Sequence, residues 1–279
     1  AAFGMDAVGL ISDPYRETAA FGAKVTFPDE QVPRCMEHIV RSIEDITRLK
    51  NPDVYNNERT LDRIKAGESL RKHVGPDVPV IGWVEGPLAE SCDLAGVNEV
   101  LLKLFMEPDF VKRLIDLTMP TARDFARAQV EAGCDIIGVG DAICSQIDVE
   151  NYRVFVKEKH QELFEYIQSL GAKVKLHICG DITHLLDDIQ EVKPDIVDID
   201  WMVDMEEAFE KLGPGIVRCG NLDPVSVIQD LNPEEIRNET ENLCKKEEGR
   251  LFIFSGGCEI TVNTPAEHLK AMRSASIFN

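Results

Sequence analysis

Three side chains in this sequence have the types and spacing of a metal site. His177 and Cys179 stand two residues apart in KVKLHICGD, so the alternation of a strand would point both side chains to one face. Cys258 follows LFIFSGG, at the end of another expected strand. One imidazole and two thiolates favour zinc over magnesium or calcium, and three protein ligands leave one coordination position open. A thiol in that position would be held as the nucleophilic thiolate.

A chance arrangement of core residues is the competing interpretation. The chain has eight cysteines and six histidines, and buried cysteines are common in protein cores. The third cysteine favours a metal because it follows a Gly-Gly pair where a strand is expected to end. A purely structural zinc would usually need a fourth Cys or His. The sequence therefore predicts a zinc site of the catalytic type.

From residue 79 onward, short β-branched runs alternate with stretches of helical periodicity, which is the pattern of βα units. The carboxyl ends of parallel barrel strands meet at one face, so ligands on distant strands can converge there. A further strand is expected in MDAVGL at 5–10. The expected strands of the regular part are VPVIGWV at 79–85, DIIGVG at 135–140, KVKLHI at 173–178, DIVDID at 195–200, GIVRC at 215–219 and LFIFS at 251–255.

These elements predict the α/β class and a TIM (β/α)8 barrel, as a single domain over 1–279. Seven strands are expected, so we expect the chain shown to lack the first, N-terminal strand of the barrel. Residues 1–78 are expected to be irregular, with a strand, a hairpin around AKVTF and surface helices, and 79–279 to hold regular βα units. A doubly wound open sheet is the alternative, but no GxGxxG follows a strand.

Charge and hydropathy exclude several classes of partner. Fifty acidic residues against 30 basic ones give a net charge of −20, which repels nucleic acid and anionic membranes. No stretch approaches the roughly 18 apolar residues of a membrane helix, and the first residues do not resemble a signal peptide. Scattered cysteines are typical of reduced thiols. We expect a cytoplasmic protein without nucleic-acid or membrane partners; a homo-oligomer stays open.

Three carboxylates at or just beyond expected strand ends are candidate catalytic residues: Glu85, Asp141 and Asp200. Each could orient His177, supply a removable fourth zinc ligand or accept the proton of an incoming thiol. A helix cap or an ion pair is an equally common role for such residues, and it is the main interpretation of Asp223, which precedes a proline.

Strand parity makes one more prediction. Lys175 shares the face of His177, and Asp198 lies on the following strand, so a Lys175–Asp198 pair extended by Arg218 would offset the cost of burying charge inside the barrel. Trp83 and Trp201 lie near strand ends and could line a pocket, although buried packing is the commoner role of tryptophan.

Four segments carry a family resemblance: HICGD, DIDWMVD, RCGNLDP and SGGCEITVNTPAEHLKAM. They resemble the uroporphyrinogen decarboxylase superfamily, and in particular its corrinoid:coenzyme M methyltransferase branch, from about residue 80 to the end. The resemblance implies a TIM barrel that moves a methyl group between a methylated corrinoid (methylcobalamin), usually on a partner protein, and a zinc-bound thiol such as coenzyme M. His177, Cys179 and Cys258 match the three ligand positions of that branch.

Two alternatives remain. Uroporphyrinogen decarboxylation is a metal-free reaction on the same fold, and it would call for converging arginines and a general acid; no arginine cluster stands at the expected strand ends. A non-catalytic barrel that only binds corrinoid or zinc is the second. The corrinoid-binding pattern D-x-H-x-x-G does not occur in the sequence, so a corrinoid would arrive on another protein.

Overall fold

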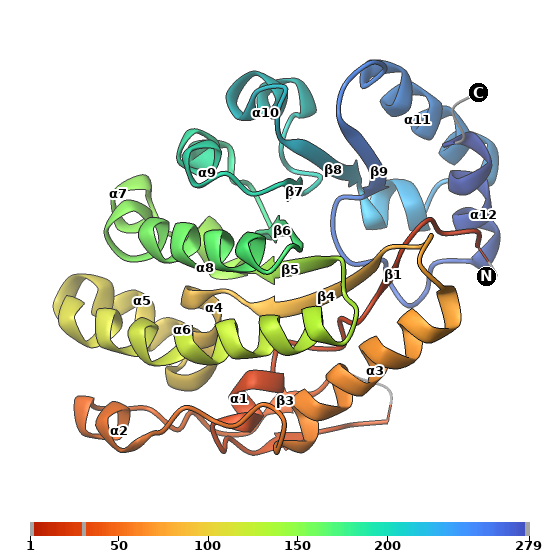
Figure 1. Ribbon diagram of the computed structural model, residues 1–279. Coiled ribbons are helices and arrows are strands. Elements are labelled where there is room, and N and C mark those ends of the chain that lie inside the picture. The colour runs from red at the N-terminus through yellow and green to blue at the C-terminus, as the bar shows by residue number, and fades with distance from the viewer. Residues whose placement is uncertain (1–2, 30–31, 277–279) are drawn as a thin grey trace.

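The computed structural model describes residues 3–29 and 32–276 of the chain. Its main sheet has the order β1-β4-β5-β6-β7-β8-β9, and every neighbouring pair in it is parallel. Figure 1 shows that this sheet is curved and that helices surround it. The strands are β1 Val8–Gly9, β4 Val80–Glu85, β5 Ile136–Gly140, β6 Lys173–His177, β7 Ile196–Asp198, β8 Val217–Leu222 and β9 Phe252–Gly256.

The helices follow the strands along the chain, as βα units require, and local sequence fixes many of their starts. Pro108 occupies the first turn of the longest helix, and Asn232 forms a capping box with Glu235 at the start of another. The α-helices are α1 Arg16–Ala20, α2 Ile43–Arg48, α3 Glu58–Val74, α4 Pro87–Ala95, α5 Val97–Met106, α6 Pro108–Glu131, α7 Val149–Asn151, α8 Lys157–Ser169, α9 Leu186–Val192, α10 Met205–Leu212, α11 Pro233–Lys246 and α12 Ala266–Ala275.

This architecture confirms the predicted α/β barrel. The described residues supply seven parallel strands, and no ladder joins β9 to β1, which is where an eighth strand would lie. The hairpin expected near AKVTF is also present, as β2 Val25–Thr26 paired antiparallel with β3 Arg34–Cys35. The first and last elements of the described chain are joined by an ion pair: Arg273 of α12 contacts Asp6, which precedes β1, at 2.7 Å.

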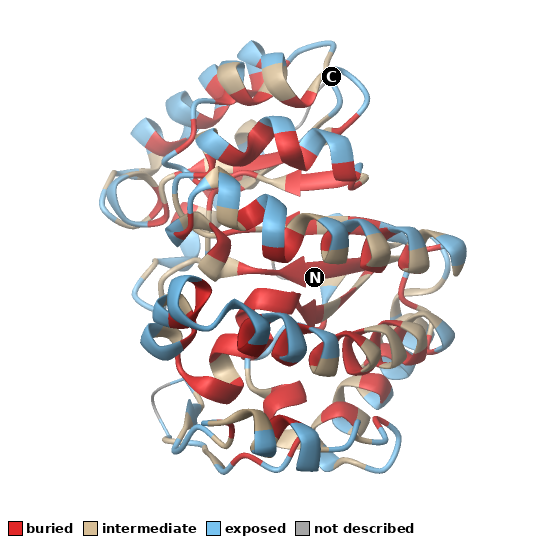
Figure 2. Cartoon of the chain, turned by 90° about the vertical axis from the view of Figure 1, so that its left-hand side faces the viewer, coloured by how far each residue is buried: buried red, intermediate tan, exposed pale blue. Residues whose placement is uncertain are grey.

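The core lies between the strands and the inner faces of the helices. Val84, Ile137 and Leu176 from three neighbouring strands are completely buried there, and Figure 2 shows the strands and the sheet-facing sides of the helices as buried. No helix in the described part of the chain is both long and apolar enough to cross a membrane.

The strand register aligns one row of residues at the carboxyl end of the sheet. Glu85 pairs with Gly140, Gly140 with His177, and His177 with Asp198 across β4, β5, β6 and β7. Cys219 of β8 continues the same row. Since paired residues on parallel strands face the same side, this row places the expected site residues on the inner face of the barrel.

Candidate metal centre and its surroundings

Three side chains meet at the carboxyl end of the barrel. Nε2 of His177, at the end of β6, lies 3.0 Å from Sγ of Cys179 and 3.9 Å from Sγ of Cys258. The two sulfurs are 3.7 Å apart although the residues are 79 positions apart in sequence. Cys258 reaches the group because it follows β9, whose carboxyl end shares this face with β6. The structure therefore brings together the three residues whose spacing predicts a metal site.

The spacing of these three atoms suits a zinc ion. With Zn–S bonds of about 2.3 Å and a Zn–N bond of about 2.0 Å, tetrahedral geometry puts two sulfurs about 3.8 Å apart and nitrogen and sulfur about 3.5 Å apart. The observed separations of 3.7, 3.0 and 3.9 Å bracket those values. His177 and both cysteines are partly accessible, so a fourth ligand can approach from the barrel mouth.

The charges of this cluster are tightly linked. Hydrogen bonds with Cys179 and His177 lower the pKa of Cys258 to about 4, and the same bond with Cys258, together with burial, raises the pKa of Cys179. Burial lowers the pKa of His177, but Asp198 and Cys258 outweigh it and raise that pKa to about 9. The cluster thus favours a thiolate on Cys258 beside the ring of His177. The thiolate is the form of cysteine that binds a metal ion.

Asp198 is the carboxylate that faces His177, a role that the sequence analysis assigned to other residues. Its Oδ2 lies 3.3 Å from Nδ1 of His177 and 2.6 Å from Nζ of Lys175. The predicted Lys175–Asp198 pair is therefore confirmed, and the same carboxylate also contacts the histidine. A carboxylate behind a metal-binding imidazole fixes the ring and directs its other nitrogen toward the metal.

The predicted extension of this pair by Arg218 is wrong. Asp198 is in register with Cys219, so Arg218 points to the opposite, outer face of β8. There it is buried, forms an ion pair with Glu247 and lies over the ring of Phe209 at 4.5 Å. The guanidinium stabilises the packing of α10 and α11 on the sheet and does not reach the barrel interior.

Asp200 is buried beside the loop that carries Cys179. Its Oδ2 accepts a hydrogen bond from the backbone N–H of Gly180 at 2.9 Å, and its Oδ1 accepts one from Met202 at 3.1 Å. Asn221 of β8 supports the loop after β7, which carries Asp200, by donating to the carbonyl of Asp200 at 3.1 Å. Asp200 therefore shapes the backbone next to a predicted ligand. The sequence signal for Asn221 is its place in RCGNLDP, one of the segments that carry the family resemblance.

Asp141 is completely buried, and neighbouring groups occupy its oxygens. It accepts hydrogen bonds from the N–H groups of Leu88 and Ala89 at the start of α4, and His160 Nε2 lies 2.9 Å away. Nδ1 of His160 pairs in turn with the Tyr152 hydroxyl at 3.0 Å. Although Asp141, Cys144 and His160 lie close enough to hold an ion, both ring nitrogens of the histidine are already engaged. We assign this network a structural role as a cap of α4.

Glu85 lies in an unexpected cluster of buried charges. Its Oε1 receives a hydrogen bond from Nη2 of Arg16 at 2.8 Å, and Nε of Arg16 lies 3.5 Å from Glu17. Arg16 and Glu17 are each only 1% exposed. No sequence pattern indicated this cluster, because α1 and β4 are joined only by the tertiary fold.

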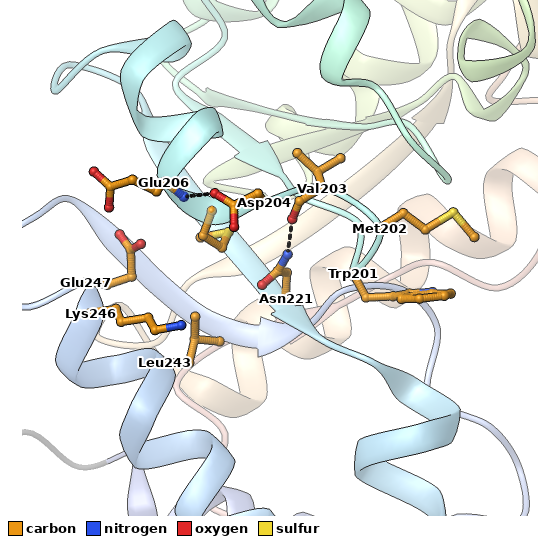
Figure 3. A pocket seen from close by; sticks show the side chains of 10 residues that line it. Trp201, Met202, Val203, Asp204, Glu206, Asn221, Leu243, Lys246 and Glu247 are labelled. Atoms are coloured by element: carbon orange, nitrogen blue, oxygen red, sulfur yellow. Dashed lines mark hydrogen bonds between the residues drawn. The ribbon is translucent and has the colours of Figure 1, made fainter.

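The two tryptophans are more exposed than their interpretation as core residues implied. Trp83 is partly exposed, and its ring centroid lies 6.3 Å from that of His177. Trp201 is 43% exposed at one end of a cavity of about 620 Å³ between the start of α10, β8 and the end of α11. Figure 3 shows this cavity with Asn221 and Glu247 on its walls. None of the three predicted metal ligands lines it, so it is separate from the metal centre.

A comparison with known families agrees with this arrangement. The model of the uroporphyrinogen decarboxylase (URO-D) family matches residues 1–276. This chain belongs to that family.

Named relatives fall into two groups. The methylcobamide:CoM methyltransferase MtbA of Methanosarcina mazei is 28% identical over 272 residues, which cover 96% of this chain and 78% of that protein. A uroporphyrinogen decarboxylase of Prochlorococcus marinus is 25% identical over 277 residues, with the same two coverages, 96% and 78%. The solved structure of a methyltransferase from Methanosarcina mazei matches 99% of this chain and 81% of its own length with a TM-score of 0.84; at 22% identity it shows the shared fold.

Proposed function

We propose that this chain is a zinc-dependent methyltransferase that transfers a methyl group between a methylated corrinoid and a small thiol. The observation that carries the proposal is the convergence of His177, Cys179 and Cys258 at tetrahedral spacing on the carboxyl face of the barrel. The name of the MtbA relative supports the reaction class and gives coenzyme M as the thiol of that protein.

Each residue of the site has a definite task in this proposal. His177 would bind zinc through Nε2 while Asp198 holds the opposite ring nitrogen, and Cys179 and Cys258 would bind as thiolates. When bound, zinc would lower the pKa of a thiol in the fourth position, so that its sulfur is a thiolate at neutral pH. Asp200 holds the loop after Cys179 and, among the three carboxylates of the sequence analysis, is the one we retain as a candidate acceptor of the thiol proton.

The overall reaction balances without a redox partner. The thiol sulfur forms a bond to the methyl carbon, and the cobalt–carbon bond breaks with its electron pair remaining on cobalt, so that methyl-cobalt(III) becomes cobalt(I). The thiol proton would pass to Asp200, the candidate acceptor, and from there to solvent. The corrinoid would be presented by a separate corrinoid protein, because the sequence lacks a corrinoid-binding pattern of its own.

Metal-free decarboxylation of uroporphyrinogen is the competing function within the family. Its eight-carboxylate substrate calls for free arginines at the site. Arg16 is paired with Glu85, and Arg218 is paired with Glu247 on the outer face of the sheet. Neither guanidinium is available to a polyanionic substrate, so the charge pattern favours the methyltransferase.

The test mixes zinc-loaded protein with methylcobalamin and a set of small thiols, and follows both the cobalamin spectrum and the methyl thioether by mass spectrometry. We expect a methyl thioether with the native protein and none with Cys258→Ala. Cys244→Ala is the matched control, since Cys244 is a buried cysteine of α11. Formation of coproporphyrinogen by zinc-free protein, without methyl transfer, would overturn the proposal in favour of the decarboxylase.

A further inference from the structure

Glu85 lies across the barrel mouth from the metal centre. It shares a row with Gly140 and His177, and two strand spacings of about 4.8 Å place the Cα atoms of Glu85 and His177 about 10 Å apart. Both side chains face the barrel interior and are partly accessible, with 9% of the Glu85 side chain and 12% of the His177 side chain exposed. A small thiol whose sulfur binds at the metal centre would therefore extend toward Glu85.

The indole of Trp83 lies over Gly140, the residue between Glu85 and His177 in this row. A Cβ atom at Gly138 would lie 2.2 Å from the indole, and one at Gly140 would lie 2.8 Å from it, so the ring lies flat across β5 where these glycines have no side chains. Gln129 fixes the strand behind the ring by accepting from the N–H of Trp83 at 2.8 Å and donating to its carbonyl at 3.0 Å. The π-face of the indole is thus held beside the path from the metal centre to Glu85.

The acidic side chains around Glu85 outnumber the basic side chains that they contact. Glu85, Glu17 and the neighbouring Asp93 interact with one buried cation, Arg16, and Glu90 lies near these carboxylates. Oε1 of Glu90 and Oε2 of Glu17 are buried without a hydrogen bond among the described residues. Burial raises the pKa of Glu85, and the nearby Glu17 and Asp93 add to the rise while Arg16 opposes it. An ammonium group bound next to Glu85 would favour the ionised form of this carboxyl group and so oppose the effect of burial.

We propose that Glu85 and the indole face of Trp83 bind an ammonium group of the methyl-accepting thiol, so that the acceptor is an aminothiol. Of the two carboxylate oxygens of Glu85, only Oε1 has a hydrogen-bond partner among the described residues. Oε2 is therefore left to accept from an ammonium group. An aromatic face beside a carboxylate is a favourable environment for such a cation. A sulfonate in the same place would meet the carboxylate, because Arg16, whose Nη2 pairs with Glu85, is only 1% exposed. The inference rests on the proposed function, whose reaction needs a thiol.

Three thiols with the same two-carbon skeleton test this inference: 2-aminoethanethiol, 2-mercaptoethanol and 2-mercaptoethanesulfonate. They differ in the group opposite the sulfur, which is a cation, a neutral hydroxyl or an anion. In zinc-loaded Trp201→Phe protein, Trp83 is the single remaining tryptophan, so its fluorescence reports binding of each thiol. We expect the Kd of the aminothiol to be about tenfold lower than that of the neutral thiol, and the sulfonate to bind more weakly than either.

Two variants test whether Glu85 is the source of the preference for the aminothiol. Glu85→Gln should bring the three Kd values to within about threefold of one another, because the amide keeps the shape and removes the charge. Glu90→Gln is the matched control: Glu90 belongs to the same group of carboxylates but contacts Thr18 of α1, and the order of the three thiols should persist. If Glu85→Gln does not fold, Trp83→Leu replaces it, and thiol binding is then measured by calorimetry. Trp83→Leu should weaken binding of the aminothiol more than binding of the other two thiols.

The outcomes separate this inference from the proposed function. Equal binding of the three thiols, or tighter binding of the sulfonate, overturns the ammonium site even if methyl transfer occurs. Failure to form a methyl thioether from methylcobalamin with any of the thiols overturns the proposed reaction, while the binding series still decides the ammonium site. A preference for the aminothiol that Glu85→Gln abolishes supports the inference.

Discussion

Nδ1 of His177 lies 3.3 Å from Oδ2 of Asp198, on the side of the ring away from the two cysteine sulfurs. Because this contact fixes which ring nitrogen faces the sulfurs, Asp198→Asn should weaken zinc binding by about 10- to 100-fold. Competition with a chromophoric chelator measures that affinity directly.

The control for this variant must account for Lys175, whose ammonium group shares the same carboxylate at 2.6 Å. Asp198→Asn leaves that charge buried without a counter-ion, which costs stability by itself. The double variant Asp198→Asn/Lys175→Met removes the stranded charge and should recover stability but not zinc affinity. Native zinc affinity in the double variant would show that Asp198 acts only as the partner of Lys175.

The two cysteines of the predicted metal site should contribute far more to zinc binding than the buried cysteines elsewhere in the chain. Cys258→Ala removes one of two sulfurs from the site, and we expect it to lower zinc affinity by about 100-fold or more. Cys134→Ala, in a buried position at the start of β5, should retain the native zinc content. Metal analysis after dialysis against a weak chelator distinguishes the two, and equal zinc retention by both variants would remove Cys258 from the site.

Asp141 should matter for stability. Asp141→Ala leaves two N–H groups of α4 and the ring of His160 without their acceptor, so we expect the free energy of unfolding in urea to fall by about 2 to 4 kcal/mol. The surface cap Asp223, which accepts from Val225 and Ser226, offers a comparison: Asp223→Ala should cost about 1 kcal/mol. A catalytic Asp141 would give the opposite pattern, with native stability and lost turnover.

The raised pKa values of the carboxyl groups of Glu85, Glu90 and Asp93 predict that the free energy of unfolding declines as pH rises. Burial, reinforced by Glu17, raises the pKa of Asp93 to about 8 from an ordinary value of 3.8. Between these two values the folded protein retains a proton that the unfolded chain has lost, so folding becomes less favourable as pH rises through this range. Asp93→Asn should therefore have a higher Tm than the native protein at pH 8, and the difference should shrink as pH falls toward about 4.

Thermal unfolding at several pH values measures this effect, with Asp187→Asn as the control because Asp187 is exposed on α9. The control should follow the native curve at every pH. Parallel curves for native protein and Asp93→Asn would mean that Asp93 is ionised in the folded state at neutral pH.

Features that depend on local pattern were predictable from the sequence. The strands from 79 onward were found because β-branched runs alternate with helical stretches, and the observed β4 to β9 lie in the predicted runs or overlap them. His177 and Cys179 could be placed on one face by strand alternation alone. Cys258 could be added because all parallel strands of a barrel end at one face.

The rest depends on contacts between strands and helices that no local pattern encodes. Arg218 faces outward because Asp198 pairs with Cys219, and a register cannot be read from either strand alone. The indole of Trp83 lies across β5 because Gly138 and Gly140 have no side chains there. The cap made by Asp141 depends on how α4 packs beside β5, and the pairing of Glu85 depends on the position of α1.

X-ray absorption at the zinc edge tests the central claim most directly, since it reports the atoms bound to the metal. The site built from His177, Cys179 and Cys258 predicts about one zinc per chain, with two sulfurs at about 2.3 Å and nitrogen at about 2.0 Å. Addition of a thiol substrate should bring a third sulfur to the same distance. Absence of bound zinc, or a shell of nitrogen and oxygen without sulfur, would contradict the account.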